Sequence, residues 1–352
     1  MTGPEVIVRR ENAVGRLTLN RPQAIHALTL GMCKAMTDAL LAWREDPAVT
    51  LVLIDHAGER GFCAGGDIRM LADSGRGDGR SAREFFLTEY RLNHLLFTYP
   101  KPVVAIVDGI TMGGGVGISM PARYRVATER TTFAMPETGI GLFPDVGGGW
   151  YLPRLPGKTG LWLALTGGRL NGAECRSLGI ATHYVSSTEI AALKQAIVVD
   201  PNGAEGLLER QDGRIEASRL DPVRPLIDEL FDQPSVEAIF AALTNHASDW
   251  AAEQIAVLRT KSPQTLKVAF RQLAIGAISE SFAANMRLEY RIASRVVQLH
   301  DFLEGVRAVV IDKDNAPRWS PDRLEDASDE AVEAIFAPLP PADEWSPLEP
   351  AI

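Results

Sequence analysis

Strand-like and helix-like segments alternate through the first half of this 352-residue chain, and this alternation limits its fold more than any other feature. The apolar runs TLVLIDH (50–56) and PVVAIVDG (102–109) predict buried strands. Residues 30–46 and 81–97 instead place apolar side chains at helical spacing. Parallel strands need a crossover connection, usually a helix, so this order predicts parallel pairing and the α/β class.

Local signals add detail to this outline. The runs VIVRR (6–10) and VGRLTL (14–19) predict a hairpin that turns at Glu11–Asn12. Ser81 is a plausible N-cap for the helix that follows it. Pro263 is suited to the first turn of a later helix, because its missing N–H would have no partner there.

The strand signal fades from about residue 173 onward, and amphipathic helical segments follow one another. We therefore predict an α/β core over residues 1–185 and a helical region over 186–325. The stretch 326–352 forms an acidic, proline-rich tail. The five prolines of its final segment, APLPPADEWSPLEPAI (337–352), predict that this segment is extended or mobile.

The composition excludes several classes of protein. A formal net charge of -9 argues against nucleic acid or an anionic membrane as the main partner. The sequence has no apolar run of the ~20 residues that span a bilayer, and its start resembles neither a signal nor a transit peptide. The three cysteines (33, 63 and 175) are too few and too scattered for a disulfide framework or a metal site. We expect a cytoplasmic protein.

Two glycine-rich turns are the first candidates for chemistry. GFCAGGDIRML (61–71) and TMGGGVGISM (111–120) each follow an apolar strand. Glycine lets a ligand approach the backbone closely, and N–H groups at a helix start favour negative charge. Two such turns at neighbouring strand ends would form an oxyanion hole. The alternative is that both are only tight turns where helices pack on a sheet.

Two acidic residues lie in a strongly apolar stretch, FAMPETGIGLFPDVGGG (133–149). Its prolines and glycines make a regular helix improbable, so Glu137 and Asp145 are expected on a loop. Burial among apolar groups raises the pKa of a carboxyl group and suits it to general-base or nucleophilic work. The alternative is that each carboxylate merely caps a turn.

Several motifs resemble a known family. LNRPQAIHALTL (19–30), FCAGGDI (62–68) and DGITMGGGVGIS (108–119) are similar to the crotonase, or enoyl-CoA hydratase/isomerase, superfamily. The segment 125–155 and the C-terminal motif DFLEGVRAVVIDKDNAPRW (301–319) resemble its 3-hydroxyisobutyryl-CoA hydrolase branch. The resemblance implies a crotonase-type spiral of ββα repeats with a helical C-terminal part, and an acyl-CoA substrate.

The resemblance also implies functional residues. Gly66 and Gly114 would supply the oxyanion-hole N–H groups, Glu137 would be the main catalytic carboxylate, and Asp145 would be its partner. The further substrate-binding residues that it implies are Glu89, Ala64, Gly65, Asp67 and Gly113. It implies no metal and no cofactor apart from the CoA of the substrate.

One position favours hydrolysis over hydration. Hydratases of the superfamily carry a glutamate two residues past the triple glycine, where this chain has Gly117, and typically a glycine where it has Asp145. The predicted function is therefore hydrolysis of a short β-hydroxyacyl-CoA, as in valine breakdown, with a Glu/Asp pair and a backbone oxyanion hole. The alternatives are an enoyl-CoA hydratase/isomerase and a non-catalytic acyl-CoA-binding protein. The preferred acyl group, the choice between monomer and homo-oligomer, and the effect of His26 in place of the family's usual asparagine stay open.

Overall fold

The computed structural model describes residues 3–213 and 218–348, and its contacts group them into two compact units. The sheet unit consists of Met1–Gly66, Arg91–Ala134 and Arg169–Arg219, and the helical unit of Asp67–Tyr90, Met135–Gly168 and Leu220–Ile352. Each unit draws on segments far apart in the sequence. The boundaries predicted at residues 185 and 325 therefore stay a prediction, and positions 349–352 of the expected tail lie outside the described residues.

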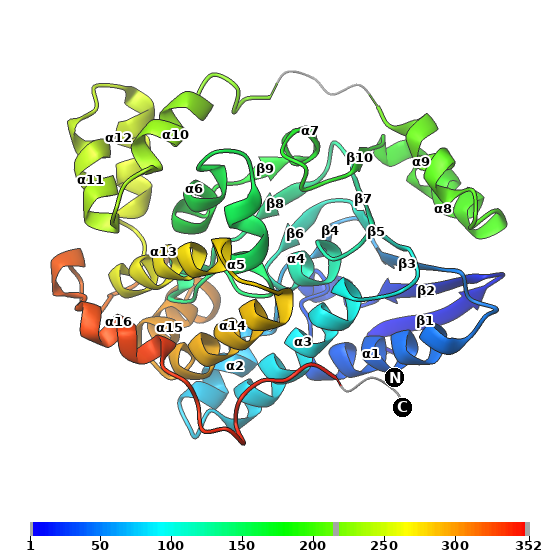
Figure 1. Cartoon of the computed structure of the whole chain (residues 1–352), viewed down its shortest axis with the longest axis horizontal. Coiled ribbons are helices and arrows are strands. Elements are labelled where there is room, and N and C mark those ends of the chain that lie inside the picture. The colour runs from blue at the N-terminus through cyan, green and yellow to red at the C-terminus, as the bar shows by residue number, and fades with distance from the viewer. Residues whose placement is uncertain (1–2, 214–217, 349–352) are drawn as a thin grey trace. The chain divides into compact units, whose positions relative to one another are not determined.

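A six-stranded sheet runs through the sheet unit (Figure 1). Its strands, in spatial order, are β1 (Val6–Glu11), β2 (Val14–Leu19), β3 (Leu51–His56), β5 (Val103–Val107), β7 (Tyr124–Ala127) and β10 (His183–Tyr184). β1 and β2 pair antiparallel and the other neighbours pair parallel. The predicted hairpin is therefore confirmed.

A second, four-stranded sheet belongs to the same unit. Its order is β4 (Gly61–Cys63), β6 (Ile110–Met112), β8 (Thr132–Ala134) and β9 (Leu170–Asn171). In each of the consecutive pairs β3/β4, β5/β6 and β7/β8, the first strand joins the six-stranded sheet and the second joins the four-stranded sheet. This repetition is the ββα pattern that the resemblance implies, and it places the ends of β4 and β6 side by side.

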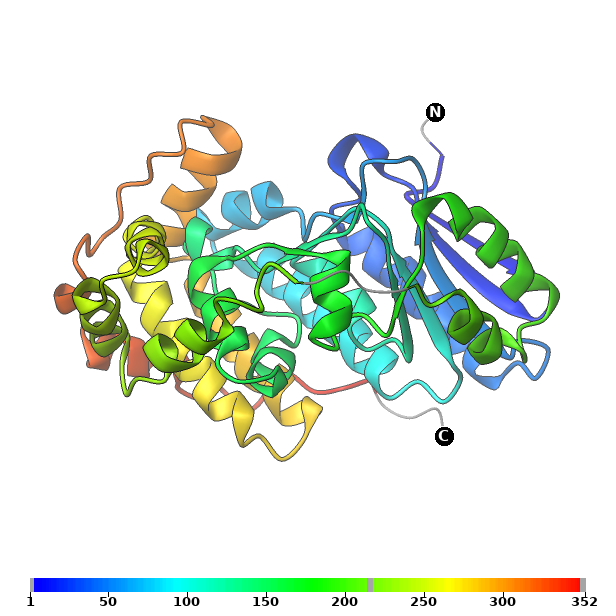
Figure 2. The same ribbon diagram turned by 90° about the horizontal axis from the view of Figure 1, so that it is seen from above.

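Helices cover both faces of the six-stranded sheet. α8 (Ile190–Val199) and α9 (Ala204–Gln211) pack on one face, where Leu193 and Ile197 join a buried cluster with Leu51, Leu53 and other strand residues. Figure 2 shows these green helices beside the blue and cyan strands. α1 (Leu30–Glu45) begins at the N-cap Thr29 and places Trp43 on Gly15, where a Cβ atom would come within 2.5 Å of the indole ring.

The helical unit packs short helices around α13 (Pro263–Ala277) and α14 (Phe282–Val296). Other helices of this unit are α2 (Ile68–Gly75), α5 (Gly148–Tyr151), α6 (Thr159–Thr166), α10 (Arg224–Phe231), α11 (Val236–Asn245), α12 (Asp249–Leu258), α15 (His300–Val306) and α16 (Asp329–Phe336). The part of α3 (Arg80–Phe97) up to Tyr90 also belongs to it. Pro263 is the first residue of its helix, as predicted.

One local prediction is wrong. α3 begins at Arg80, so Ser81 lies inside the helix, while Asp78 accepts a 2.9 Å hydrogen bond from the Arg80 N–H at its start. The first part of the acidic, proline-rich tail contains α16, which packs on α14. The described residues that follow α16 form no further helix or strand, and the side chain of Trp345 among them is buried.

No helix among residues 3–213 and 218–348 combines the length and the apolar character that crossing a bilayer requires. Cys33, Cys63 and Cys175 are buried free thiols. The described residues contain no group of three or more histidine, cysteine, aspartate or glutamate side chains suited to a metal ion.

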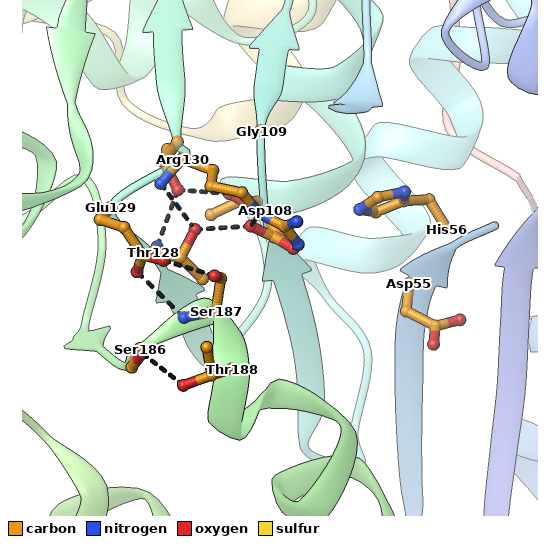
Figure 3. Close-up of polar contacts among 12 residues, drawn as sticks. Asp55, His56, Asp108, Gly109, Thr128, Glu129, Arg130, Ser186, Ser187 and Thr188 are labelled. Atoms are coloured by element: carbon orange, nitrogen blue, oxygen red, sulfur yellow. Dashed lines mark hydrogen bonds and ion pairs between the residues drawn. The ribbon is translucent and has the colours of Figure 1, made fainter. Parts of the chain in front are cut away.

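Polar side chains join the ends of the central strands (Figure 3). Asp108 follows β5 and accepts hydrogen bonds from Thr128 Oγ1 at 2.6 Å and Arg130 Nε at 2.9 Å. Glu129 accepts a 2.9 Å bond from the Ser187 N–H. These bonds tie together the loops that follow β5, β7 and β10.

A buried carboxylate stabilises the face of this sheet that α8 covers. Asp55 on β3 accepts hydrogen bonds from Arg16 at 2.7 Å, Thr18 at 2.7 Å and Lys194 at 2.9 Å. Burial alone would raise the pKa of Asp55, but these three donors together hold it below its ordinary value of 3.8. A carboxylate with a lowered pKa stabilises the fold above its ordinary pKa, and this contribution is lost as the pH falls through the lowered value.

We predict that Asp55→Asn lowers the free energy of unfolding by about 3 kcal/mol at neutral pH, because two cations lose their buried partner. The loss should shrink on acidification, when the wild-type carboxylate is also protonated. Urea unfolding at several pH values measures both effects. Asp73→Asn, at an exposed ion pair with Arg76, is the control and should change stability by less than about 0.5 kcal/mol. A loss at Asp55 as small as this control would contradict the prediction.

Candidate active site

The two glycine-rich turns of the sheet unit touch each other. Gly65 has a φ of +118°, and a Cβ atom built there would lie 3.9 Å from the Gly114 nitrogen. A Cβ atom on Gly115 would lie 2.6 Å from the Cys63 carbonyl oxygen. A side chain at Gly115 would push the turns apart, and the positive φ of Gly65 favours glycine, so the close approach of the two turns depends on glycine.

In each turn, one backbone N–H group has no hydrogen-bond acceptor among the described residues. The first turn is held by the bonds from Leu28 N–H to Gly65 O, at 2.8 Å, and from Ala64 N–H to Ile25 O, at 2.9 Å. Within the described part of the chain, neither the Gly66 nor the Gly114 N–H donates a hydrogen bond to protein. Gly114 is the first residue of the short helix α4 (Gly114–Ser119), where such amides are free.

The acidic loop belongs to the helical unit and has an irregular backbone. Glu137 opens a single 3₁₀ turn, which ends at Gly141 with a left-handed φ of +70°. Asp145 precedes two left-handed residues, Val146 at φ +51° and Gly147 at φ +93°. The loop predicted from the prolines and glycines is therefore present, and α5 begins directly after it.

Three carboxyl groups of the helical unit influence one another. Glu89 on α3, Glu137 and Asp145 are buried, with exposed fractions of 2%, 4% and 5%. Burial raises the pKa of Glu89 and of Glu137 well above the ordinary value, and the charge of Asp145 raises both further. One oxygen each of Glu89 and Glu137 is buried without a hydrogen-bond partner among the described residues.

Asp145 differs from the other two because it has a strong donor. The hydroxyl of Tyr90 donates a 2.8 Å hydrogen bond to Asp145 Oδ2. Burial raises the pKa of Asp145 to about 6, and the Tyr90 hydrogen bond limits the rise. Burial and the surrounding carboxylates raise the pKa of Tyr90 itself, so its proton stays on the phenol. Asp145 is thus the first of the three to ionise.

Sequence reasoning missed the residues that support this cluster. Tyr90 is adjacent to Glu89, and Glu289 is the acidic residue of the LEYR motif (288–291), yet neither was assigned a role. Glu289 is fully buried and accepts hydrogen bonds from the N–H groups of Gly147 and Gly149. Gln272 and Asn285 also donate to it. The sequence alone does not indicate that α14 contacts a loop about 140 positions earlier in the chain; only the folded structure shows it.

The remaining predicted substrate-binding residues lie on the first glycine-rich turn and at the starts of α2 and α4. Gly113 has a φ of +46° and is the N-cap of α4. Ala64 is exposed on the first turn. Asp67 is the N-cap of α2 and accepts a bond from the Met70 N–H at 3.4 Å. Gly117 lies inside α4, which carries no acidic side chain.

His26 occupies the turn position at which the family usually has asparagine. Its φ of +54° is in the left-handed region, which asparagine tolerates better than most residues. The Arg21 N–H donates to His26 Nδ1 at 2.9 Å, and Nε2 lies 2.8 Å from the Ala57 carbonyl oxygen. Burial lowers the pKa of His26 to about 4, so the ring is neutral at physiological pH. His26 caps this turn.

The chain was compared with known proteins. The family model described as enoyl-CoA hydratase/isomerase matches residues 14–336. A protein named 3-hydroxyisobutyryl-CoA hydrolase, mitochondrial, from Xenopus tropicalis is 45% identical over 96% of this chain and 90% of its own length. The protein of the same name from Homo sapiens is 41% identical over 96% of this chain and 90% of its own length.

Two solved structures are also similar. A carnitinyl-CoA dehydratase from Mycobacterium thermoresistibile has a TM-score of 0.93 and 42% identity, covering 98% of this chain and 99% of its own. An enoyl-CoA hydratase from Rhodobacter sphaeroides 2.4.1 has a TM-score of 0.90 and 38% identity, covering 97% and 99%. The predicted fold is confirmed. The predicted cytoplasmic location is contradicted, because the curated relatives are mitochondrial enzymes.

We predict that Tyr90→Phe raises the pKa of Asp145 above about 6, because the variant loses the donor that stabilises the carboxylate. The ¹³C signal of the Asp145 carboxyl group, followed against pH, measures the shift. Tyr99→Phe is the matched control, since that hydroxyl donates to the Leu40 carbonyl oxygen instead. An Asp145 titration that is unchanged in Tyr90→Phe, or moved to lower pH, would contradict the prediction.

Proposed function

The chain belongs to the enoyl-CoA hydratase/isomerase family, and from this premise we propose that it hydrolyses the thioester of a short-chain β-hydroxyacyl-CoA such as 3-hydroxyisobutyryl-CoA. The observation that carries the proposal is the 45% identity over 96% of the chain with a 3-hydroxyisobutyryl-CoA hydrolase. The resemblance inferred from the sequence motifs is thereby confirmed. The products would be the free hydroxy acid and CoA.

The glycine amides would stabilise the negative charge that develops on the thioester oxygen. As water or a carboxylate attacks the carbonyl carbon, this oxygen takes up the electron pair of the double bond. The Gly66 and Gly114 N–H groups, which have no acceptor among the described residues, are the donors that we assign to it. Loss of one such donor typically costs ~10²–10³ in rate.

The buried carboxyl groups would supply the nucleophile or base. Glu137 either attacks the carbonyl carbon and forms a mixed anhydride, or removes a proton from an attacking water. Asp145 would orient the water or bind the acyl hydroxyl. Because the charge of Asp145 raises the pKa of Glu137, the two would titrate as a coupled pair. Glu89 and the turn residues Ala64, Gly65, Asp67 and Gly113 would contact the substrate.

The route through Glu137 can be decided with oxygen isotopes. In the anhydride route, water attacks either carbonyl carbon of the anhydride, and attack at the glutamyl carbon leaves a water oxygen in Glu137. In the general-base route, the water oxygen enters only the acid product. Label found in Glu137 after a single turnover in heavy-oxygen water, by mass spectrometry of the peptide that contains it, would support the anhydride route.

Hydration of an enoyl-CoA is the second candidate, because the two similar solved structures are described as a hydratase and a dehydratase. Adding water across a double bond needs one group to activate the water and another to protonate the α-carbon. Hydratases of the family carry one of these groups on the helix that corresponds to α4, where this chain has Gly117. The absence of a carboxylate from α4 favours hydrolysis.

The finer assignments are part of the proposal. The small β-hydroxy acyl group places the enzyme in valine catabolism. We propose that the reaction uses no metal and no cofactor beyond the CoA of its substrate, since fixed N–H dipoles would stabilise the oxyanion. The acidic chain gives no reason to expect a nucleic-acid partner.

We predict that Glu137→Gln lowers kcat for hydrolysis of 3-hydroxyisobutyryl-CoA by about a hundredfold or more and leaves KM nearly unchanged. Thiol release, followed with a chromogenic disulfide, measures both constants. Glu237→Gln, at an ion pair with Lys267, is the control and should keep wild-type kinetics. If Glu137→Gln retained more than about a tenth of kcat, a barrier change below ~1.4 kcal/mol, the catalytic role would be wrong.

The same variant should fold at least as stably as the wild type. A carboxyl group whose pKa is raised on folding destabilises the native state as the pH rises through its unfolded value of 4.5 toward the folded one. Glutamine removes this penalty. Glu137→Gln should therefore unfold at higher urea concentration than wild type at pH 8, and at nearly the same concentration at pH 4.

A further inference from the structure

Glu289 is a buried carboxylate that the proposed mechanism does not use. It lies on α14 and is fully buried. Its Oε2 accepts a 2.7 Å hydrogen bond from the Gly147 N–H, and its Oε1 accepts a 2.9 Å bond from the Gly149 N–H. These two amides belong to the segment directly after Asp145. We infer that Glu289 is a positioning residue for Asp145: its carboxylate holds the Asp145 segment in a conformation that the segment would not keep alone.

The backbone after Asp145 needs such support. Val146 has a φ of +51°, and a β-branched residue in this region is a steric outlier. Gly147 follows at φ +93°. Two consecutive left-handed residues persist only where the surroundings determine them. Glu289 supplies this determination, because the two amides that it binds lie on either side of Gly148.

Two amide side chains complete the support. Gln272 on α13 donates to Glu289 Oε1 at 3.1 Å and to the Pro144 carbonyl oxygen at 2.7 Å. Asn285 donates to the same carboxylate oxygen at 2.9 Å. Gln272 therefore fixes the residue before Asp145, while Glu289 fixes the residues after it.

The packing around this carboxylate leaves no room for a side chain on the loop. A Cβ atom on Gly149 would lie within 3.1 Å of Asn285, Gln272 and Glu289 atoms. A Cβ atom on Gly276 would lie 1.8 Å from the Gly149 carbonyl oxygen. Glycine at position 149 thus matches the contacts of Glu289, as expected if Glu289 holds this segment in place.

The hydrogen bonds also define the charge on Glu289. All four of its partners are N–H donors, so the carboxylate form is the one that satisfies them. Burial raises the pKa of Glu289 to about 8, while the amide donors oppose the rise. Its negative charge interacts with Asp145 and Tyr90. Asp145 interacts in turn with Glu89 and Glu137.

No cation cancels this charge within the described residues. Arg154, which follows α5, donates instead to the carbonyl oxygens of Trp150 and Gly276. Asp145, with a pKa of about 6, ionises before Glu289, with a pKa of about 8, so the titration of Asp145 does not depend on a charge at Glu289. A positioning role thus predicts a change in the geometry around Asp145 while its titration stays as in the wild type.

The test is Glu289→Gln, assayed as the full-length enzyme with 3-hydroxyisobutyryl-CoA. The inference rests on the proposed hydrolase function, so thiol release by the wild type is measured first. We expect kcat to fall by at least about tenfold, because a misplaced catalytic group loses rate steeply, with KM within about threefold of wild type. The acid limb of the kcat profile, which the ionisation of Asp145 near pH 6 would set, should keep its wild-type position.

Gln272→Leu is the second variant. It removes the bonds to Pro144 and Glu289 but keeps the negative charge. We expect a lower kcat at an unchanged KM, with the acid limb in its wild-type position. If Glu289→Gln does not fold, Gln272→Leu alone tests the positioning role of Glu289.

Glu174→Gln is the matched control, because Glu174 is equally buried and accepts bonds from Asn171 N–H and Arg219 in the sheet unit. It should lose stability without changing kcat or the pH profile. If wild type releases no thiol, the proposed function fails. If wild type releases thiol while Glu289→Gln and Gln272→Leu, where folded, keep its kcat, the proposed function stands and the positioning role of Glu289 is wrong.

Discussion

The cost of burying carboxylates is the constraint on which the helical unit depends. Glu89, Glu137, Asp145 and Glu289 are all at most 5% exposed, and none of the four forms an ion pair with a lysine or arginine in the described chain. Buried charges without partners are strongly unfavourable, so the fold must supply neutral donors or leave protons on the groups. It does both. Where donors are present they oppose the rise of the pKa, and where they are missing the pKa rises well above its ordinary value.

This distribution of donors separates the carboxyl groups by role. Glu289 has four N–H donors, and burial raises its pKa to about 8 against them. Asp145 has the Tyr90 hydroxyl, which keeps its pKa near 6. Glu137 and Glu89 each have an oxygen without a partner in the described structure, and such an oxygen is available to a substrate or a water. The stability lost at these two positions is the usual cost of a site prepared for chemistry.

The sequence predicted what is local and missed what is not. Alternating apolar runs predicted the strands and helices, and the glycine turns were recognisable because glycine has few other reasons to cluster. Glu137 and Asp145 stood out as charges in an apolar stretch. Tyr90 and Glu289 did not, because their importance comes from contacts across about 55 and 140 positions of the chain. Ser81 lies inside the helix and not at its N-cap, because the helix begins at Arg80, where Asp78 accepts a hydrogen bond from the first amide. The cellular location was wrong because the absence of a leader-like pattern carried too much weight.

The central claim is that these buried carboxyl groups act on the carbon of a thioester rather than on a carbon–carbon double bond. The direct test incubates the purified protein with 3-hydroxyisobutyryl-CoA and, in parallel, with crotonyl-CoA. Free thiol is followed in the first reaction, and the enoyl absorbance in the second. The account predicts rapid thiol release from the hydroxyacyl-CoA and negligible loss of the enoyl absorbance. Loss of the enoyl absorbance without release of thiol from either substrate would contradict it.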